Sequence, residues 1–368
     1  MRTMRAAVLH EVGKPLSIEE VEIDSPKERE VLVRVVASGI CHSDYSVAHG
    51  VLRSPLPVVL GHEAAGIVEE IGPSVHDFEP GDHVIASLTP ACGACPMCRE
   101  EKPFLCHQTV ATMGFSTMLD GTTRLRAAGK PAHQLCAIAS FAEYAVIPEG
   151  SLVKVDGDVP LEKVCLIGCG VTTGMGAALN TARIATGTTV AVIGCGGVGL
   201  SIIQGARIAG AKTIIAIDPI GEKRKLALSV GATHALDPTE GDPVKAVREI
   251  CSGGVHYAFE ALGRTQTIEQ AWAMTRATGL AVVVGVPKVS DEVKLRVGGF
   301  LQQKAIMGST YGSAVPRQDI PRFIELYRKG ELDLDSMITS RIRLDDVNQA
   351  LDAMGRGEGA RSVVVFAA

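Results

Sequence analysis

Short apolar segments separated by turn residues fill the first 170 residues of the chain. Each apolar or alternating run is followed closely by Gly, Pro or Asp, which favour turns. The runs that we predict to be β-strands are Ala6–Leu9, Val31–Ala37, Ala65–Ile71 and His83–Ser87. This pattern predicts a turn-rich, barrel-like β domain. The stretch from Ser116 to Cys136 is polar and basic for its surroundings, and we expect a long surface loop there.

The hydrophobic period changes after about Gly170, where apolar strands begin to alternate with amphipathic helical stretches. The predicted strands are Thr189–Ile193, Thr213–Ile217, His234–Leu236, Tyr257–Glu260, Ala281–Val284 and Ala305–Met307. The predicted helices are Leu200–Ala209, Glu222–Val230, Pro243–Cys251 and Gln266–Thr275. Six strands with helices between them predict a parallel, doubly wound sheet.

The tail from about Gly312 returns to mixed helix and strand, and we expect its last strand, Arg361–Phe366, to rejoin the β domain. The two patterns together predict an α/β protein of two domains. A β-rich domain comprises residues 1–170 and 312–368, and a doubly wound domain comprises residues 171–311.

Composition narrows the classes of partner. A net charge of −5 without a block of like charge argues against nucleic acid and anionic membranes. The first ten residues lack an apolar core of the kind a secretory signal has, and the longest apolar run, about Val190 to Ile203, is interrupted by glycines. We therefore expect a cytoplasmic protein with neither a nucleic-acid nor a membrane partner.

Four cysteines follow the spacing C-x2-C-x2-C-x7-C, at Cys92, Cys95, Cys98 and Cys106. Four thiolates complete the tetrahedral shell of Zn²⁺, so such a site holds a loop rather than performing chemistry. The alternatives are four unrelated buried thiols or an iron–sulfur cluster. Bacterial ferredoxin runs, however, close with a three-residue gap and Cys-Pro, whereas His107 follows the quartet here. We predict a structural zinc, and this clustering indicates a reducing compartment.

A glycine-rich turn lies between a predicted strand and a predicted helix. Its residues are Gly194, Cys195, Gly196, Gly197, Val198 and Gly199. In this context the motif G-x-G-x-x-G predicts a dinucleotide site, because the helix N-terminus holds a pyrophosphate. Gly194 allows the tight turn, Gly196 the approach of the ligand, and Gly199 close helix–strand packing.

Asp218 ends the second strand of this domain, at the position where a carboxylate can hydrogen-bond the adenosine ribose. A carboxylate there repels a 2′-phosphate, so we expect NAD rather than NADP. Lys223 and Arg224 follow closely and weaken that preference. The alternative role for Asp218 is a helix-capping or turn residue.

Three further candidate ligands are widely separated: Cys41, His62 and Cys169. Together they would give a zinc with three protein ligands and the open position that a catalytic metal needs. Each taken alone could equally be a small buried thiol or a core histidine, and spacing does not prove that they meet.

The chain closely resembles the zinc-dependent medium-chain alcohol dehydrogenases of the liver and aryl-alcohol type, which carry the long loop. The segments that carry the resemblance are GICHSD, GHEAAGIVE, PGDHV, the cysteine quartet, LEKVCLIGCGVTTG, IGCGGVGLS, FEALGR, VVVGVP and GEGARSVVVF. The resemblance implies a GroES-like catalytic domain and a Rossmann domain with a cleft between them. It also implies a catalytic zinc at Cys41, His62 and Cys169, and a structural zinc at the quartet.

The same resemblance implies roles around the metal. Glu63 would lie behind the zinc, and Asp44 would hold the free N–H of His62. Ser43 is our candidate to receive the proton of the alcohol hydroxyl, because a hydroxyl can accept one proton while it donates another. Zinc would acidify that hydroxyl, and hydride would pass to the nicotinamide. Ser43 could otherwise be a helix-capping serine.

Further implied contacts involve the dinucleotide. His42 would lie near the pyrophosphate. Lys223, which lies close to Asp218 in the sequence, is a further candidate cofactor-binding residue. Thr173, Val198 and Val286 would flank the nicotinamide. Arg264 and Arg361 would contact phosphates or ribose, although either arginine could instead form a surface ion pair.

One position departs from the family pattern. Many members have a histidine five residues after the first zinc cysteine, where it completes a proton relay, but Ser46 stands here. His49 is nearby, and nothing in the sequence places it in that role. We expect proton release through the cofactor ribose and water.

The implied substrate pocket contains Ser43, Leu88, Leu135 and Cys136, which favours a primary alcohol with an apolar or aromatic tail and its aldehyde. A thiol-linked formaldehyde dehydrogenase, using glutathione or mycothiol, is the first alternative, with Arg124, Arg126 and Lys130 as possible thiol-binding cations. A zinc- and NAD-binding sensor without turnover is the second. We expect a homodimer whose sheet continues across the two-fold axis near Ala305–Met307.

Overall fold

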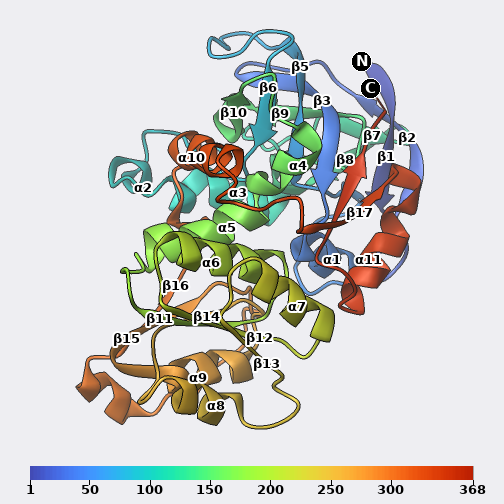
Figure 1. Cartoon of the computed structure of the whole chain (residues 1–368). Helices are drawn as coiled ribbons and strands as arrows, with labels where there is room; N and C mark the ends of the chain where they lie inside the picture. The colour runs from blue at the N-terminus through green and yellow to red at the C-terminus, as the bar shows by residue number, and fades with distance from the viewer. Residues whose placement is uncertain (368) are drawn as a thin grey trace. The chain divides into compact units, whose positions relative to one another are not determined.

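The computed structural model describes residues 1–367, which form two compact units (Figure 1). The first unit contains Met1–Cys169, Val315–Glu325 and the segment from Ile338 onward, and the second contains Gly170–Ala314 and Leu326–Met337. The tail that we assigned wholly to the β domain is thus divided. Leu326–Met337 packs with the second unit, where the Gln204 amide donates to the Asp333 carbonyl at 3.0 Å and accepts its N–H at 2.7 Å. The domain limits remain a prediction.

A closed barrel forms one part of the first unit. Its strands, in order around the barrel, are β1 (Arg2–Leu9), β2 (Ser17–Ile23), β7 (Leu125–Ala127), β8 (Lys130–Gln134) and β4 (Val58–Val59). Alternate side chains of these strands, including Val8, Val21 and Leu125, fill a buried apolar core. The barrel-like β domain that we predicted is confirmed.

The predicted surface loop from Ser116 to Cys136 is wrong, because β7 and β8 run through it and close the barrel. Leu125 and Ala127 point inward and Arg126 outward, a period of two that the many charged residues obscured. Arg124 is also buried, with 1% of its surface exposed.

A second, seven-stranded sheet completes the first unit. Its order is β10 (Leu152–Val155), β6 (His83–Ala86), β5 (Glu63–Ile71), β3 (Glu30–Gly39), β18 (Arg361–Val365) and β17 (Ile338–Ile342), with β9 (Tyr144–Pro148) also paired to β3. The last strand therefore rejoins the β domain as expected, antiparallel to β3. This pairing brings the ends of β3, β5 and β18 together.

Short helices connect these strands. They are α1 (His42–Ala48), α2 (Pro96–Arg99), α3 (His107–Phe115), α4 (Leu161–Val164), α10 (Pro316–Arg328), which continues into the second unit, and α11 (Val347–Gly355). The 3-10 turns η1 (Pro103–Leu105), η2 (Leu135–Ala137), η3 (Glu149–Ser151), η4 (Cys165–Gly168) and η8 (Leu344–Asp346) lie between them.

The second unit is built on a six-stranded parallel sheet. Its order is β13 (His234–Leu236), β12 (Thr213–Ile217), β11 (Thr189–Ile193), β14 (Val255–Glu260), β15 (Thr275–Val283) and β16 (Ala305–Gly308). The accompanying helical elements are α5 (Gly170–Gly176), η5 (Ala177–Thr181), α6 (Gly197–Ile208), α7 (Gly221–Ser229), α8 (Pro243–Ile250), α9 (Thr265–Met274), η6 (Val297–Gln302) and η7 (Tyr311–Ser313). In Figure 1, α6 lies on one side of the sheet and α8 and α9 on the other. The predicted doubly wound sheet is confirmed, and its order reverses between β11 and β14.

Within residues 1–367 no single helix has the length and apolar composition needed to cross a membrane, and only one bent pair, Leu161–Gly168 with Gly170–Thr181, meets both criteria together.

Candidate functional site

Four potential metal ligands meet in the first unit: Cys41, His62, Glu63 and Cys169. One ligand atom from each lies within 4.8 Å of every other, and all four side chains are buried. The pairing of Gly39 with Glu63 across β3 and β5 brings the first three together, and Cys169 directly follows η4. The three ligands predicted for a catalytic zinc therefore do converge.

Asp44 ties the two ligand-bearing segments to each other. Its carboxylate accepts the backbone N–H groups of Cys41 and Gly61, each at 3.0 Å. It also lies 3.1 Å from Nδ1 of His62, and it has no exposed surface. With Nδ1 occupied, Nε2 is the ring nitrogen that His62 can offer to a metal.

The titratable groups of this cluster strongly shift one another's pKa values. A hydrogen bond between the two thiols lowers the pKa of Cys41 well below its usual value and raises that of Cys169. Burial opposes the charge on His62, yet attraction to Asp44 and the two sulfurs raises its pKa well above the usual value. Two thiolates and an imidazole are a typical donor set for Zn²⁺, so the residues fit this metal.

Glu63 is paired with a residue of the last strand, because Arg361 Nη2 donates to its carboxylate. Both side chains are buried. Burial raises the pKa of Glu63 to about 7, while the charge of Arg361 acts to lower it. The sequence analysis missed this pair, since the two residues lie 298 positions apart. The role that we expected for Arg361 at the cofactor stays a prediction.

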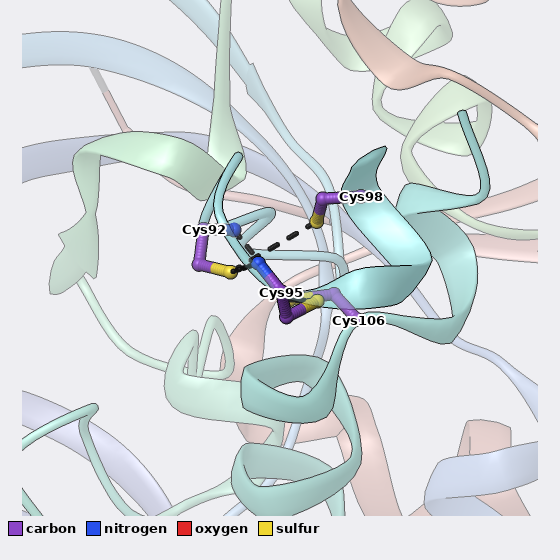
Figure 2. A group of neighbouring side chains, drawn as sticks. All are labelled: Cys92, Cys95, Cys98 and Cys106. Carbon is purple, nitrogen blue, oxygen red and sulfur yellow. Dashed lines mark hydrogen bonds between the residues drawn. The ribbon is translucent and has the colours of Figure 1, made fainter. Parts of the chain in front are cut away.

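The cysteine quartet forms a second cluster, in which all four sulfurs lie within 4.8 Å of one another (Figure 2). Cys92 and Cys98 are 3.9 Å apart at their sulfurs, as are Cys95 and Cys106. Four sulfurs at about 2.3 Å from one zinc lie about 3.8 Å from each other, so the spacing fits this ion. Backbone N–H groups of Ala94 and Cys95 donate to the Cys92 sulfur, which suits a thiolate. None of the cysteines in residues 1–367 forms a disulfide.

Helix α1 begins directly after Cys41 and carries the residues expected near the reacting groups. The Ser43 hydroxyl lies 3.9 Å from the Cys41 sulfur. Nδ1 of His42 lies 3.3 Å from the hydroxyl of Ser46. The ring of His49 stacks on Tyr45 at 3.9 Å, and its Nδ1 lies 3.0 Å from the Tyr45 carbonyl. His49 is therefore engaged along its own helix.

The residues expected to line the substrate pocket are all at least partly buried. Leu88, Leu135 and Cys136 are buried, and Ser43 is half-buried. Burial raises the pKa of the Cys136 thiol to about 11, and charges on His62, Asp44 and Cys41 also act on it. Cys136 therefore lies near the metal cluster.

The glycine turn of the second unit has the properties that a pyrophosphate site requires. Gly194 has φ = +93°, which disfavours other residues. A Cβ on Gly199 would overlap the carbonyl of Gly194, whereas a Cβ on Gly196 would meet nothing within 4 Å. The turn therefore leaves space where a ligand can approach the backbone, and α6 begins there.

Asp218 is buried and fixes this turn from the neighbouring strand. Its carboxylate accepts the N–H of Cys195 at 2.8 Å and that of Ile220 at 2.9 Å. Each carboxylate oxygen can accept further bonds, so contact with a ribose is compatible with this geometry.

The remaining predicted dinucleotide contacts differ in exposure. Val198, Thr173 and Lys223 are half-buried, while Arg264 and Val286 are exposed. The sequence analysis did not single out Glu260, which is buried at the end of β14 and accepts the N–H groups of Leu262 and Gly263. The sequence could have drawn attention to Glu260, because it is a carboxylate at the carboxyl end of a predicted strand in a parallel sheet.

Comparisons with known proteins cover the whole chain. The alcohol dehydrogenase GroES-like domain family matches residues 27–157, and the zinc-binding dehydrogenase family matches residues 197–329. Alcohol dehydrogenase class-3 of Cereibacter sphaeroides is 40% identical over 377 residues, which cover 100% of both chains.

Two solved structures extend the likeness to three dimensions. Benzyl alcohol dehydrogenase from Acinetobacter calcoaceticus is 34% identical, with a TM-score of 0.95 over 100% of both chains. A zinc-binding dehydrogenase from Sinorhizobium meliloti 1021 bound to NADP is 30% identical, with a TM-score of 0.82 over 100% of both chains. The matches agree with the two cysteine-containing clusters and the glycine turn, and the chain belongs to the zinc-dependent medium-chain alcohol dehydrogenases, which use zinc and a nicotinamide dinucleotide.

Proposed function

We propose that this enzyme interconverts a primary alcohol with an apolar or aromatic tail and the corresponding aldehyde, using NAD as the hydride acceptor and donor. The convergence of Cys41, His62 and Cys169 carries this proposal, because these side chains can hold zinc with a fourth position left for substrate. Bound zinc would supply Lewis-acid polarisation of the substrate oxygen.

The surrounding side chains would keep that fourth position open. Arg361 holds the Glu63 carboxylate, which is the only other ligand group of this cluster among residues 1–367. Asp44 orients the imidazole of His62. Cys41, His62 and Cys169 would then serve as ligands, with Glu63 as a charged neighbour.

Ser43 is the residue that we assign to the proton of the alcohol. A hydroxyl can accept one proton while it donates another, and Ser43 lies beside Cys41. No histidine occupies position 46, and His49 is held by Tyr45. We propose that bound cofactor would supply, through its ribose, the route from Ser43 to water.

The preference for NAD rests on Asp218. Its carboxylate is fixed by two backbone N–H groups, so a 2′-phosphate would approach an immobile negative charge. Because the relative from Sinorhizobium meliloti is bound to NADP, the affinities of this chain for NAD and for NADP should both be measured.

The substrate class rests on the pocket side chains and on one relative. Leu88 and Leu135 offer apolar surface, and benzyl alcohol dehydrogenase resembles this chain over its whole length. Buried Arg124 is paired with Glu30 and Asp120, so it is not free to bind a thiol cofactor. Thiol-linked formaldehyde oxidation stays the second candidate, because alcohol dehydrogenase class-3 is 40% identical to this chain. Only Arg126 and Lys130 of the basic trio are exposed.

A steady-state screen on metal-quantified protein tests the proposal. We expect NAD reduction with benzyl alcohol and long-chain primary alcohols, and weaker reduction with ethanol. Formaldehyde oxidation that requires glutathione or mycothiol would instead favour the thiol-linked enzyme. No turnover on any alcohol, with a single zinc per chain, would favour a sensor.

We also propose a homodimer formed through β16, together with a cytoplasmic location. β16 is the last strand in the order of its sheet, and Met307 on it is 43% exposed, with Leu301 nearby at 89%. An open strand edge beside apolar side chains is a suitable surface for a second copy. Light scattering on wild-type protein and on Leu301→Asp tests this, with a shift toward monomer expected.

A further inference from the structure

Arg224 lies beside the adenosine end of the proposed NAD site, and a second acid holds it. Its Nη1 donates to the backbone carbonyl of Asp218 at 2.7 Å, not to the Asp218 carboxylate. The same nitrogen lies 2.8 Å from the carboxylate of Asp237. The guanidinium is thus fixed by two acceptors on neighbouring strands.

Asp237 is itself held in place at the end of β13. Its Oδ1 accepts the backbone N–H of Thr239 at 2.9 Å and the hydroxyl of Thr239 at 2.6 Å. Oδ2 is the atom that faces Arg224. The carbonyl of Leu236, the preceding residue, accepts the N–H of Asp218 at 3.3 Å, so the strand end that carries Asp237 adjoins Asp218.

A 2′-phosphate on the ribose would bring negative charge next to Asp218, and its binding would require a cation. Arginine is well suited to that task, because its planar fork matches phosphate oxygens. Arg224 adjoins Asp218, but its Nη1 is already committed to Asp237 and to the Asp218 carbonyl.

We propose that Asp237 is a specificity-determining residue, which favours NAD over NADP by keeping the Arg224 guanidinium away from the 2′ position. The inference rests on the proposed binding of NAD at Asp218. It assigns Asp237 an indirect role, through Arg224, rather than contact with the cofactor.

The substitution Asp237→Asn separates the charge from the local fold. Its amide oxygen can still accept both bonds from Thr239, while its NH₂ group cannot accept a bond from Arg224. The substitution Glu240→Gln is the matched control, because it removes one negative charge three residues away, and exposed Glu240 forms no ion pair with Arg224 among residues 1–367. Asp237→Glu keeps the charge and should retain the wild-type preference.

Calorimetric titration of the zinc-loaded full chain with NAD and with NADP gives the ratio of the two Kd values. In Asp237→Asn we expect the ratio of the NADP Kd to the NAD Kd to fall about fivefold, the upper end of the range for exposed ion pairs, because this pair is largely buried. Glu240→Gln should leave the ratio unchanged. Adding Arg224→Ala to Asp237→Asn should cancel the gain.

Two results would overturn the inference: an unchanged ratio in Asp237→Asn, or a gain that persists when Arg224 is also removed. The second would mean that Asp237 acts by simple repulsion. Wild-type protein that bound neither dinucleotide would overturn the proposed function, and with it this inference. An unchanged Kd ratio in Asp237→Asn, when the protein still binds NAD, would overturn only the inference.

Discussion

Oδ1 of Asp44 lies 3.1 Å from Nδ1 of His62, and both side chains are buried. The same carboxylate receives the backbone N–H groups of Cys41 and Gly61. One acid thus fixes the tautomer of a ligand and the distance between two ligand-bearing segments. This arrangement positions the Cys41 and His62 segments for metal binding.

The substitution Asp44→Asn should weaken zinc at this cluster. The amide can accept from His62 and Gly61 through its oxygen, but its NH₂ group then faces the N–H of Cys41, which cannot accept. We expect a loss of about 10–100-fold in metal affinity or activity, the usual effect of removing a partner behind a ligand. Competition with a chelator, counting zinc released per chain, measures it.

Asp242→Asn is the matched control, since Asp242 caps α8 in the second unit by accepting the N–H of Val244. It should affect stability slightly and zinc retention not at all. Equal zinc retention in Asp44→Asn and wild type would contradict the positioning role of Asp44.

The quartet cluster should behave as an independent structural site. Substituting Cys98→Ser breaks its donor set, and we expect the loss of about one zinc per chain and a lower Tm, because metal binding contributes directly to folding. Cys251→Ser, at a buried cysteine outside both clusters, should keep the full zinc content. Metal analysis and a thermal melt of both variants test this prediction. An unchanged zinc content in Cys98→Ser would exclude a structural zinc at the quartet.

The buried ion pair between Arg124, just before β7, and Glu30, at the start of β3, should be costly to break on one side. Arg124 donates to Glu30 through Nε at 2.8 Å, and the pair is buried. Substituting Arg124→Met leaves the Glu30 carboxylate without its partner, which costs about 3–5 kcal/mol. The double variant Glu30→Gln with Arg124→Met should recover most of this loss in urea unfolding.

Arg126→Met serves as the comparison for that pair, because Arg126 is exposed on β7, two residues after Arg124, and its effect should stay within about 0.5 kcal/mol. Equal stability of Arg124→Met and Arg126→Met would show that the buried pair contributes nothing.

Cys195 should be unreactive despite its place in the glycine turn. Burial raises the pKa of its thiol to about 12, and the charge of Asp218 acts in the same direction. Because the thiol is neutral below that pKa, the reactive thiolate is a small fraction at pH 8 and should increase about tenfold for each pH unit up to about 12. Iodoacetamide followed by peptide mapping should label Cys195 only after unfolding. Rapid labelling in the native protein at pH 8 would disagree with this burial.

His49 should be dispensable for proton transfer. Its ring is held by Tyr45, so His49→Ala should change kcat/KM by less than about tenfold, and the pH–rate profile should lack a histidine-like inflection from position 46. His10→Ala provides a comparison, since His10 is an exposed histidine paired with Glu19. A loss of about 100-fold or more in His49→Ala alone would identify His49 as the base.

Local pattern was sufficient for three strands of the second unit. The bounds of β11, β12 and β13 are those predicted. β11 and β12 are buried and nearly continuous apolar runs, and the glycine turn marks where α6 begins. The metal ligands could be predicted only through a family resemblance, since Cys41 and Cys169 are far apart in the sequence and each alone is an ordinary buried thiol.

The long-range charge pairs could not be predicted from the sequence. Arg124 lies in a polar stretch, and its burial depends on Glu30, 94 residues earlier. Neither residue alone carries a signal, because arginine and glutamate are usually exposed. Asp237 is hidden in the same way: it follows a three-residue strand in a loop-like context, and only the fold places it against Arg224.

The pairing of Glu63 with Arg361 has a consequence for biosynthesis. The acid is translated 298 residues before its counter-ion, when β18, which later pairs with β3, does not yet exist. A nascent chain therefore carries Cys41, His62 and Glu63 without the guanidinium that later restrains the carboxylate. A metal ion bound at that stage would meet a different set of ligands. Correct metal selection therefore requires that β18 has already paired with β3.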